Sequence, residues 1–249
     1  MRPRIPAAIA VVLAVGSCAI SCAPSQAATE AALRPSFSPN RLGASTTLTV
    51  AVTLLAGQGE GPEALPPPLS GMVLHLPAGL QVNLRGLAAC SPARLQALGA
   101  RGCPPGSSLG RGHSLVIVHP ASQTIEESAT LSVFRAPKRH GRPAIAILSQ
   151  GYTPLYQRSV IIGVLQPDAA PYAAKLVLSI PPIPTLRFEP DASTATLSLS
   201  IGGLGRSTAR APGAIVEPGS CGAGGFRFAA DFAFADGTAA RATAGAHCP

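Results

Sequence analysis

The sequence predicts an all-β fold, and three observations support this prediction. Alternating apolar and polar residues, the period-2 pattern of a half-buried strand, recur along most of the chain. In addition, 26 glycines and 26 prolines interrupt these runs and leave almost no segment long enough for a helix. Finally, about 220 of the 249 residues remain once the N-terminal segment is set aside, enough for one large β domain. We therefore predict an antiparallel double-sheet β-sandwich of the immunoglobulin-like type.

The predicted strands follow the alternating runs. They cover residues 45–56, 71–77, 113–119, 128–136, 143–152, 158–166, 173–180, 193–203 and 224–234. Asp236-Gly237 comes shortly after the last run and predicts a two-residue hairpin turn. The segment "PKRHGRP" (137–143) joins two strong runs and predicts a longer hairpin tip.

One short helix is predicted, between Ser91 and Ala100, inside the loop that Cys90 and Cys103 bracket. Ser91 can cap the helix, and the proline that follows it suits the first helical position. Gly99 can end the helix.

The first 27 residues are predicted to be a secretory signal peptide. Two arginines precede an apolar run over 5–23, and Ser25-x-Ala27 then supplies a cleavage site of small residues. Residues 28–40 are predicted as an N-terminal leader and residues 41–249 as the β-sandwich domain. A faint internal repeat leaves an alternative of two tandem sandwiches, at about 36–136 and 143–249.

A second interpretation of the signal remains open. The segment Val15-Gly16-Ser17-Cys18 resembles a lipobox, the motif after which bacterial lipoproteins are cut and acylated on the new N-terminal cysteine. The apolar run continues past Cys18, which favours simple cleavage. A lipid on Cys18 would instead anchor the mature chain to the outer face of the cell membrane.

Four cysteines lie beyond the signal: Cys90, Cys103, Cys221 and Cys248. An even number of cysteines in an exported chain predicts two disulfides. We favour the local pairs Cys90–Cys103 and Cys221–Cys248, because each pair brackets one compact stretch, although four cysteines allow two other pairings. Neither pair has the C-x-x-C spacing of a metal site, and no metal or cofactor is predicted.

The pentapeptide Gly106-Ser-Ser-Leu-Gly110 fits the G-x-S-x-G pattern of a hydrolase nucleophile elbow and makes Ser108 a candidate nucleophile. An elbow needs a strand before the serine and a helix after it. Here two prolines precede the pentapeptide and a predicted strand follows it. We therefore interpret Ser108 as a turn residue at the end of a disulfide loop.

Charge and aromatic residues indicate the candidate binding surface. The formal net charge of +8 falls to +6 if Arg2 and Arg4 leave with the signal, and the remaining basic residues are spread along the chain, so nucleic-acid binding is not expected. The densest basic patch contains Arg135, Lys138, Arg139, His140 and Arg142. It could bind phosphate or an acidic glycan, or it could be a solvated tip that discourages edge pairing.

The chain has no tryptophan, and its three tyrosines, Tyr152, Tyr156 and Tyr172, complete the candidate surface.

The element from Cys90 to Gly110, with the proline-bounded strands around it, resembles uncharacterised secreted proteins of high-GC bacteria. The shared pattern is a cysteine-closed loop ending Cys-Pro-x-x-Ser-x-x-Gly, matched here by Cys103, Pro104, Ser107 and Gly110. The resemblance implies export and the disulfide loop. It implies nothing about activity, because no activity is known for these proteins.

From the residues alone we expect an exported, non-enzymatic β-sandwich protein of the cell envelope or extracellular space. Its partner would be an envelope polymer or another surface protein, with membrane contact only through the signal or a lipid on Cys18. Two alternatives remain: a secreted serine hydrolase using Ser108, and a carrier with a small-ligand cavity between the sheets.

Overall fold

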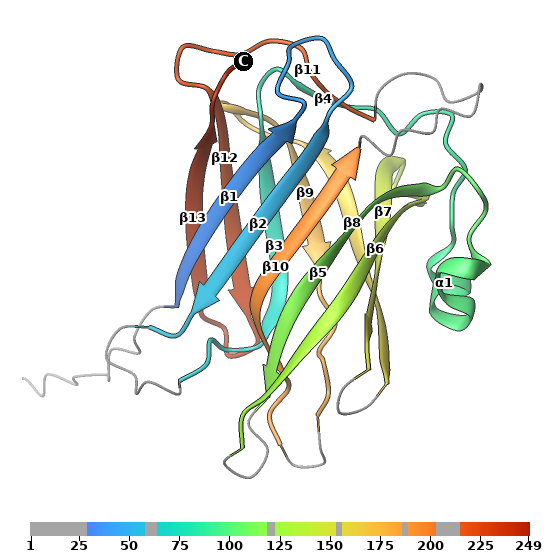
Figure 1. The fold of residues 1–249 in the computed structure, drawn as a ribbon, viewed down its shortest axis with the longest axis vertical. Coiled ribbons are helices and arrows are strands. Elements are labelled where there is room, and N and C mark those ends of the chain that lie inside the picture. The colour runs from blue at the N-terminus through green and yellow to red at the C-terminus, as the bar shows by residue number, and fades with distance from the viewer. Residues whose placement is uncertain (1–28, 58–63, 119–122, 153–155, 186–188, 203–214) are drawn as a thin grey trace, which may run out of the picture.

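The computed structural model describes residues 29–57, 64–118, 123–152, 156–185, 189–202 and 215–249 (Figure 1). The predicted signal peptide, its cleavage site and Cys18 lie outside the described residues. Within the described part of the chain, no helix has both the length and the apolar character needed to cross a membrane.

Strands make up nearly all of the regular secondary structure of the described chain. They are β1 (Glu30–Ser38), β2 (Thr47–Leu55), β3 (Leu69–Pro77), β4 (Leu80–Val82), β5 (Ser108–Val118), β6 (Ile125–Arg139), β7 (Arg142–Gly151), β8 (Gln157–Pro167), β9 (Tyr172–Ser179), β10 (Ser193–Gly202), β11 (Val216–Pro218), β12 (Phe226–Phe234) and β13 (Ala239–Ala246). The helix α1 (Pro92–Leu98) is followed by a short 3₁₀ turn over Gly99–Gly102. The predicted all-β class and the single short helix are confirmed.

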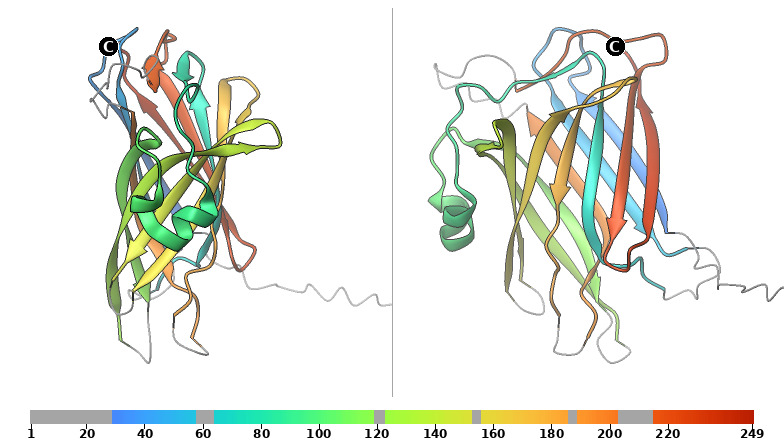
Figure 2. Two further views of the ribbon diagram at one scale, coloured as in Figure 1. Left: turned by 90° about the vertical axis from the view of Figure 1, so that its right-hand side faces the viewer. Right: turned by 180° about the vertical axis from the view of Figure 1, so that it is seen from behind.

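Eleven strands form one antiparallel sheet in the order β1-β2-β10-β5-β6-β7-β8-β9-β3-β12-β13, and β4 pairs with β11 in a separate ladder. The large sheet curls until its two edge strands, β1 and β13, lie side by side (Figures 1 and 2). The antiparallel arrangement is confirmed. A sandwich of two separate immunoglobulin-like sheets is not, because the strand order is continuous from one edge to the other.

Alternation along each strand explains the curled sheet. In β2, Leu48, Val50, Val52 and Leu54 are buried inside the curl, whereas the intervening threonines and alanine are partly exposed. Burying a leucine or valine side chain stabilises the fold by about 1.5–3 kcal/mol. The interior is completed by phenylalanines on β12, including Phe226, Phe228 and Phe232, which are fully buried. The core therefore lies inside the curl.

Segments distant in sequence are neighbours in this sheet. β10 is hydrogen-bonded between β2 and β5, and β3 is hydrogen-bonded between β9 and β12. Strands on both sides of residue 140 are therefore interleaved. The stretch predicted as an N-terminal leader contains β1, which pairs with β2 along its whole length.

Both predicted hairpin connections differ in length from the expectation. The β6–β7 connection is tight, because Arg139 pairs with Arg142 and only His140 and Gly141 lie between them. Both of these residues have positive φ, 49° and 74°, as a type I′ turn requires. The β12–β13 connection is longer than two residues, because the backbone N–H of Phe234 donates to the carbonyl oxygen of Thr238 and residues 235–237 lie between them.

The helix α1 lies outside the curl, against the outer face of the sheet (Figure 2). Its Leu95 is fully buried in a second, smaller core with Phe134, Ala146 and Leu148. Ser91 caps the helix by accepting a hydrogen bond from the backbone N–H of Arg94. Gly99 ends it with a φ of 66°.

Candidate functional site

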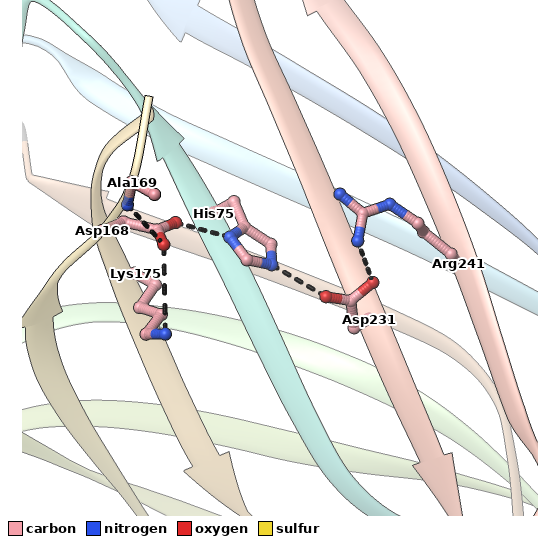
Figure 3. A network of polar contacts seen from close by, with 6 residues as sticks. All are labelled: His75, Asp168, Ala169, Lys175, Asp231 and Arg241. Carbon is pink, nitrogen blue, oxygen red and sulfur yellow. Dashed lines mark hydrogen bonds and ion pairs between the residues drawn. The ribbon is translucent and has the colours of Figure 1, made fainter. Parts of the chain in front are cut away.

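The most connected group of charged side chains lies on the outer face of β3, β9, β12 and β13 (Figure 3). We call it the His75 network. Its members are Lys175, Asp168, His75, Asp231 and Arg241. The alternation that points Leu74 and Leu76 into the core points His75 outward between them.

His75 lies between two carboxylates (Figure 3). Its Nδ1 is 2.5 Å from an oxygen of Asp168 and its Nε2 is 2.8 Å from an oxygen of Asp231. A carboxylate only accepts hydrogen bonds, so both contacts are hydrogen bonds at once when the ring carries a proton on each nitrogen. In that state a positive ring is held between two negative groups.

Asp168 follows the last residue of β8 and is the most enclosed member, with 9% of its side chain exposed. Burial raises the pKa of this carboxyl group, but the hydrogen bonds from His75 and the backbone N–H of Ala169, together with the charges of His75 and Lys175, outweigh burial and lower the pKa below 3.8. The network therefore favours the ionised carboxylate.

Strand register places the other members. Lys175 lies directly opposite His75 on β9, and its Nζ is 3.9 Å from Asp168. Asp231 lies diagonally across from His75 on β12, and Arg241 lies directly opposite Asp231 on β13 and donates to it at 2.7 Å. These are the neighbouring positions at which cross-strand pairs interact.

The aromatic ring of Tyr172 covers one side of the histidine, with 5.0 Å between the ring centroids. The His75 side chain is 12% exposed. With both ring nitrogens bonded to carboxylates, neither is available as a base toward a serine or cysteine. In the described part of the chain, no group of three or more His, Cys, Asp and Glu side chains could hold a metal ion. In this structure, the His75 network joins β3, β9, β12 and β13 through hydrogen bonds and ion pairs.

Sequence patterns did not predict this network. Asp168 is 93 residues from His75, and Asp231 is 156 residues from it. The local signal was the outward position of His75, Lys175, Asp231 and Arg241 on their own strands, and that signal does not contain the register that joins the strands or the position of Asp168 after β8.

The predicted basic patch is divided by the structure. Lys138, Arg139, His140 and Arg142 are exposed at the end of the β6–β7 hairpin, and we call these four residues the basic tip. This hairpin projects away from the rest of the sheet (Figure 2). Arg135 is separate, because its Nη1 donates at 2.5 Å to the carbonyl oxygen of Leu87 and holds the segment before α1.

Among the described residues, none forms an ion pair with the lysine or arginines of the basic tip. Arg139 and Arg142 face each other directly across the turn. Like charges at directly opposite positions destabilise a strand pair. The basic tip is therefore a concentration of positive charge that the described fold does not neutralise.

The three tyrosines do not form one surface. Tyr152 and Tyr156 are in contact, with ring centroids 5.4 Å apart, at the β7–β8 end of the sheet. Tyr172 starts β9 at the other end of β8, and that 11-residue strand separates its two ends by about 33 Å. The candidate surface therefore consists of separate places: the basic tip, the Tyr152–Tyr156 pair, and Tyr172 beside His75.

Ser108 is the first residue of β5 and is exposed, and the chain continues from it as a strand. Gly106, with a φ of 77°, makes the turn before it. Its neighbour Ser107 is buried and donates to the carbonyl oxygen of Pro104 at 2.7 Å. This arrangement differs from the strand–turn–helix of a nucleophile elbow.

Both disulfides are present in the predicted local pairing, Cys90–Cys103 and Cys221–Cys248. The first closes the loop that carries α1. The second joins the C-terminal residues after β13 to the segment before β12.

An apolar cavity of about 70 Å³ lies inside the curl, lined only by aliphatic and methionine side chains of β2, β3, β9, β10 and their neighbours. Sites for drug-sized ligands usually measure about 300–1,000 Å³. The cavity is thus far smaller than the carrier hypothesis requires.

Comparisons of this chain with protein-family models, with curated protein sequences and with solved structures give no match. Function is therefore inferred from the arrangement of its charged and aromatic side chains.

Proposed function

We propose that this chain is an exported, non-enzymatic protein of the cell envelope or extracellular space, and that it binds an anionic envelope polymer through the basic tip. One observation carries the proposal: Lys138, Arg139 and Arg142 are exposed at the end of a projecting hairpin and have no ion-pair partner among the described residues.

The turn itself supports binding over a purely solvated role. A type I′ turn fixes the backbone of Arg139 and Arg142 on either side of two residues, so only their side chains need ordering when an anion binds. A phosphate or carboxylate between the two guanidinium groups would also relieve their mutual repulsion. Arginine presents a planar fork of donors that matches both anions.

Export is supported by two features. The predicted signal peptide at 1–27 has the order of regions that secretion requires, and the two disulfides are of a kind that persists in oxidising compartments. Under this proposal, the resemblance to secreted proteins of high-GC bacteria and a lipid on Cys18 both remain predictions.

The two alternatives have less support. Ser108 starts a strand instead of joining a strand to a helix, and both nitrogens of His75 are occupied by carboxylates. A carrier that binds its ligand inside the curl would need a cavity several times larger than the one of about 70 Å³ found there.

Binding of the mature protein to polyphosphate and to hyaluronate, measured by calorimetry at two salt concentrations, tests the proposal. The variant combines Lys138→Gln, Arg139→Gln and Arg142→Gln. Each basic residue near an anionic surface contributes about 1 kcal/mol, so the variant should bind about a hundredfold more weakly and with a smaller salt dependence.

The matched control combines Arg34→Gln, Arg41→Gln and Arg227→Gln, three exposed arginines on other parts of the molecule. It removes the same charge and should bind within about twofold of the wild type. Equal losses in both variants would assign binding to overall charge. Absence of binding by the wild type to both polymers would reject an envelope polymer as the partner.

A further inference from the structure

The Tyr152–Tyr156 pair is the most exposed aromatic surface of the described chain. Tyr152 is 66% exposed and Tyr156 is 53% exposed. The rings touch at a centroid distance of 5.4 Å and an angle of 47° between their planes. Tyrosines so exposed are typical of binding surfaces, because an aromatic ring offers a large rigid contact area with few torsions to order.

The position of Tyr156 is set by polar neighbours. Gln150 donates its side-chain N–H to the Tyr156 hydroxyl at 3.2 Å. The guanidinium carbon of Arg158 lies 5.5 Å from the centroid of the same ring, within range of a cation–π contact. The ring is therefore held from two sides before any ligand arrives.

Arg158 connects the pair to the helix. Its Nη1 donates to the carbonyl oxygens of Gln96 and Ala97 at 3.0 and 3.1 Å, at the end of α1. Basic groups at this end of a helix satisfy unpaired carbonyls. The disulfide Cys90–Cys103 closes the loop that carries α1. It therefore restrains the helix to which Arg158, and through Arg158 the Tyr156 ring, is attached.

The shape and chemistry of the pair fit carbohydrate. The two ring centroids are 5.4 Å apart, a spacing comparable to one sugar residue of an extended glycan, and the exposed face of each tilted ring can stack against the C–H face of a pyranose ring. The hydroxyls and the Gln150 amide can exchange hydrogen bonds with sugar hydroxyls. The Arg158 guanidinium beside the rings already donates to the carbonyl oxygens of Gln96 and Ala97, so the pair does not require a charged ligand.

We infer that Tyr152 and Tyr156 form a stacking platform for two adjacent sugar rings of a neutral glycan. The platform is separate from the basic tip, because Arg142 and Gly151 are the two ends of β7, and a strand of 10 residues spans about 30 Å. The inference therefore stands without the proposed binding of an anionic polymer.

Tyrosine fluorescence gives a direct test, because the chain contains three tyrosines and no tryptophan. The mature protein is titrated with cellohexaose and, separately, with the hexamer of β-1,4-linked N-acetylglucosamine, and calorimetry provides an independent affinity. We expect a saturable fluorescence change with at least one hexamer. Tyr152→Ala should weaken that binding about tenfold, because it removes one stacking ring.

Tyr152 is the residue to change because, among the described residues, its ring contacts the ring of Tyr156, whereas Tyr156 also contacts Arg158, which supports α1. Tyr152→Phe keeps the ring and should bind within about twofold of the wild type. Tyr172→Phe is the matched control, because it removes a hydroxyl and a fluorophore at the other end of β8; it should also bind normally.

Two results would overturn the inference: no saturable binding to either hexamer, or unchanged binding by Tyr152→Ala. A third is saturable binding of a ten-residue polyproline peptide without binding of either sugar, since the pair would then be a peptide surface. Loss of sugar binding in the basic-tip variant with normal binding by Tyr152→Ala would place the glycan at the tip and also reject the inference.

Discussion

Two charged regions of this molecule differ in whether the fold neutralises them. In the His75 network, basic and acidic side chains alternate from Lys175 through to Arg241, and each side chain contacts the next. In the basic tip, Arg139 and Arg142 are directly opposite each other and carry the same charge. The first region uses charge to join strands, whereas the second leaves charge available to a partner.

The difference follows from strand register. Opposite charges at facing or diagonal positions of a sheet stabilise it, and like charges at facing positions destabilise it. Substitutions in the His75 network should therefore lower the free energy of unfolding, and substitutions in the basic tip should weaken polymer binding.

The largest effect on stability is expected for His75→Ala. This change leaves Asp168, an enclosed carboxylate, with Lys175 at 3.9 Å as its remaining side-chain ion-pair partner. An enclosed charged group that loses its partner costs about 1–3 kcal/mol, so we expect a loss of about 2 kcal/mol in the free energy of unfolding, measured in urea. The control His113→Ala, at an exposed position on β5, should change it by less than about 0.5 kcal/mol. Equal effects of the two changes would contradict a structural role for the network.

A smaller effect is expected from pH. The pKa of Asp168 is lower in the folded protein than its ordinary value of 3.8, so the ionised group stabilises the fold above pH 3.8, and this contribution is lost as the pH falls below that value. Asp168→Asn should remove this part of the acid sensitivity. The measurement is the urea midpoint of both proteins between pH 6 and about pH 2.5.

Asp236 provides a comparison for the same experiment. Its hydrogen bonds from the side chain and backbone of Thr238 lower its pKa below 3.8 as well. Asp236→Asn should therefore also reduce the fall of the urea midpoint at acidic pH, independently of Asp168→Asn. If the urea midpoint of Asp168→Asn falls with acid as steeply as that of the wild type, the contact with His75 does not favour the charged carboxylate.

The smallest effects separate the two regions most sharply. Arg241 pairs with Asp231, but its side chain is 53% exposed, so Arg241→Gln should cost about 0.5 kcal/mol of unfolding free energy. Arg142→Gln removes a like-charge contact and should leave that free energy unchanged or raise it by a few tenths of a kcal/mol. A loss in Arg142→Gln as large as in Arg241→Gln would show that the basic tip also stabilises the fold.

Local patterns were sufficient for most strands. The alternation in β2 and β12 is strong because one face of each strand is buried and the other is not. β1 was not predicted. It is an edge strand that contains Pro35, and although edge strands tolerate proline, this residue interrupts the alternating pattern. β4 and β11, with three residues each, are too short to show alternation.

The candidate sites also differ in how far the sequence could predict them. The basic tip is continuous in sequence, so its residues could be named from the sequence, although the turn proved tighter than predicted. The predicted grouping of Tyr172 with Tyr152 and Tyr156 is absent from the structure, because the 11 residues of β8 separate them. The His75 network joins residues up to 156 positions apart and had no local signal.

By itself the sequence determined the all-β class, the helix inside the first disulfide loop, and the local pairing of Cys90 with Cys103 and of Cys221 with Cys248. These features depend on residues close together along the chain. Only the tertiary structure decided that the strands form one curled sheet and which outward side chains meet on it. Strand order is selected by how the whole set of apolar faces can be buried together, and no single segment carries that information.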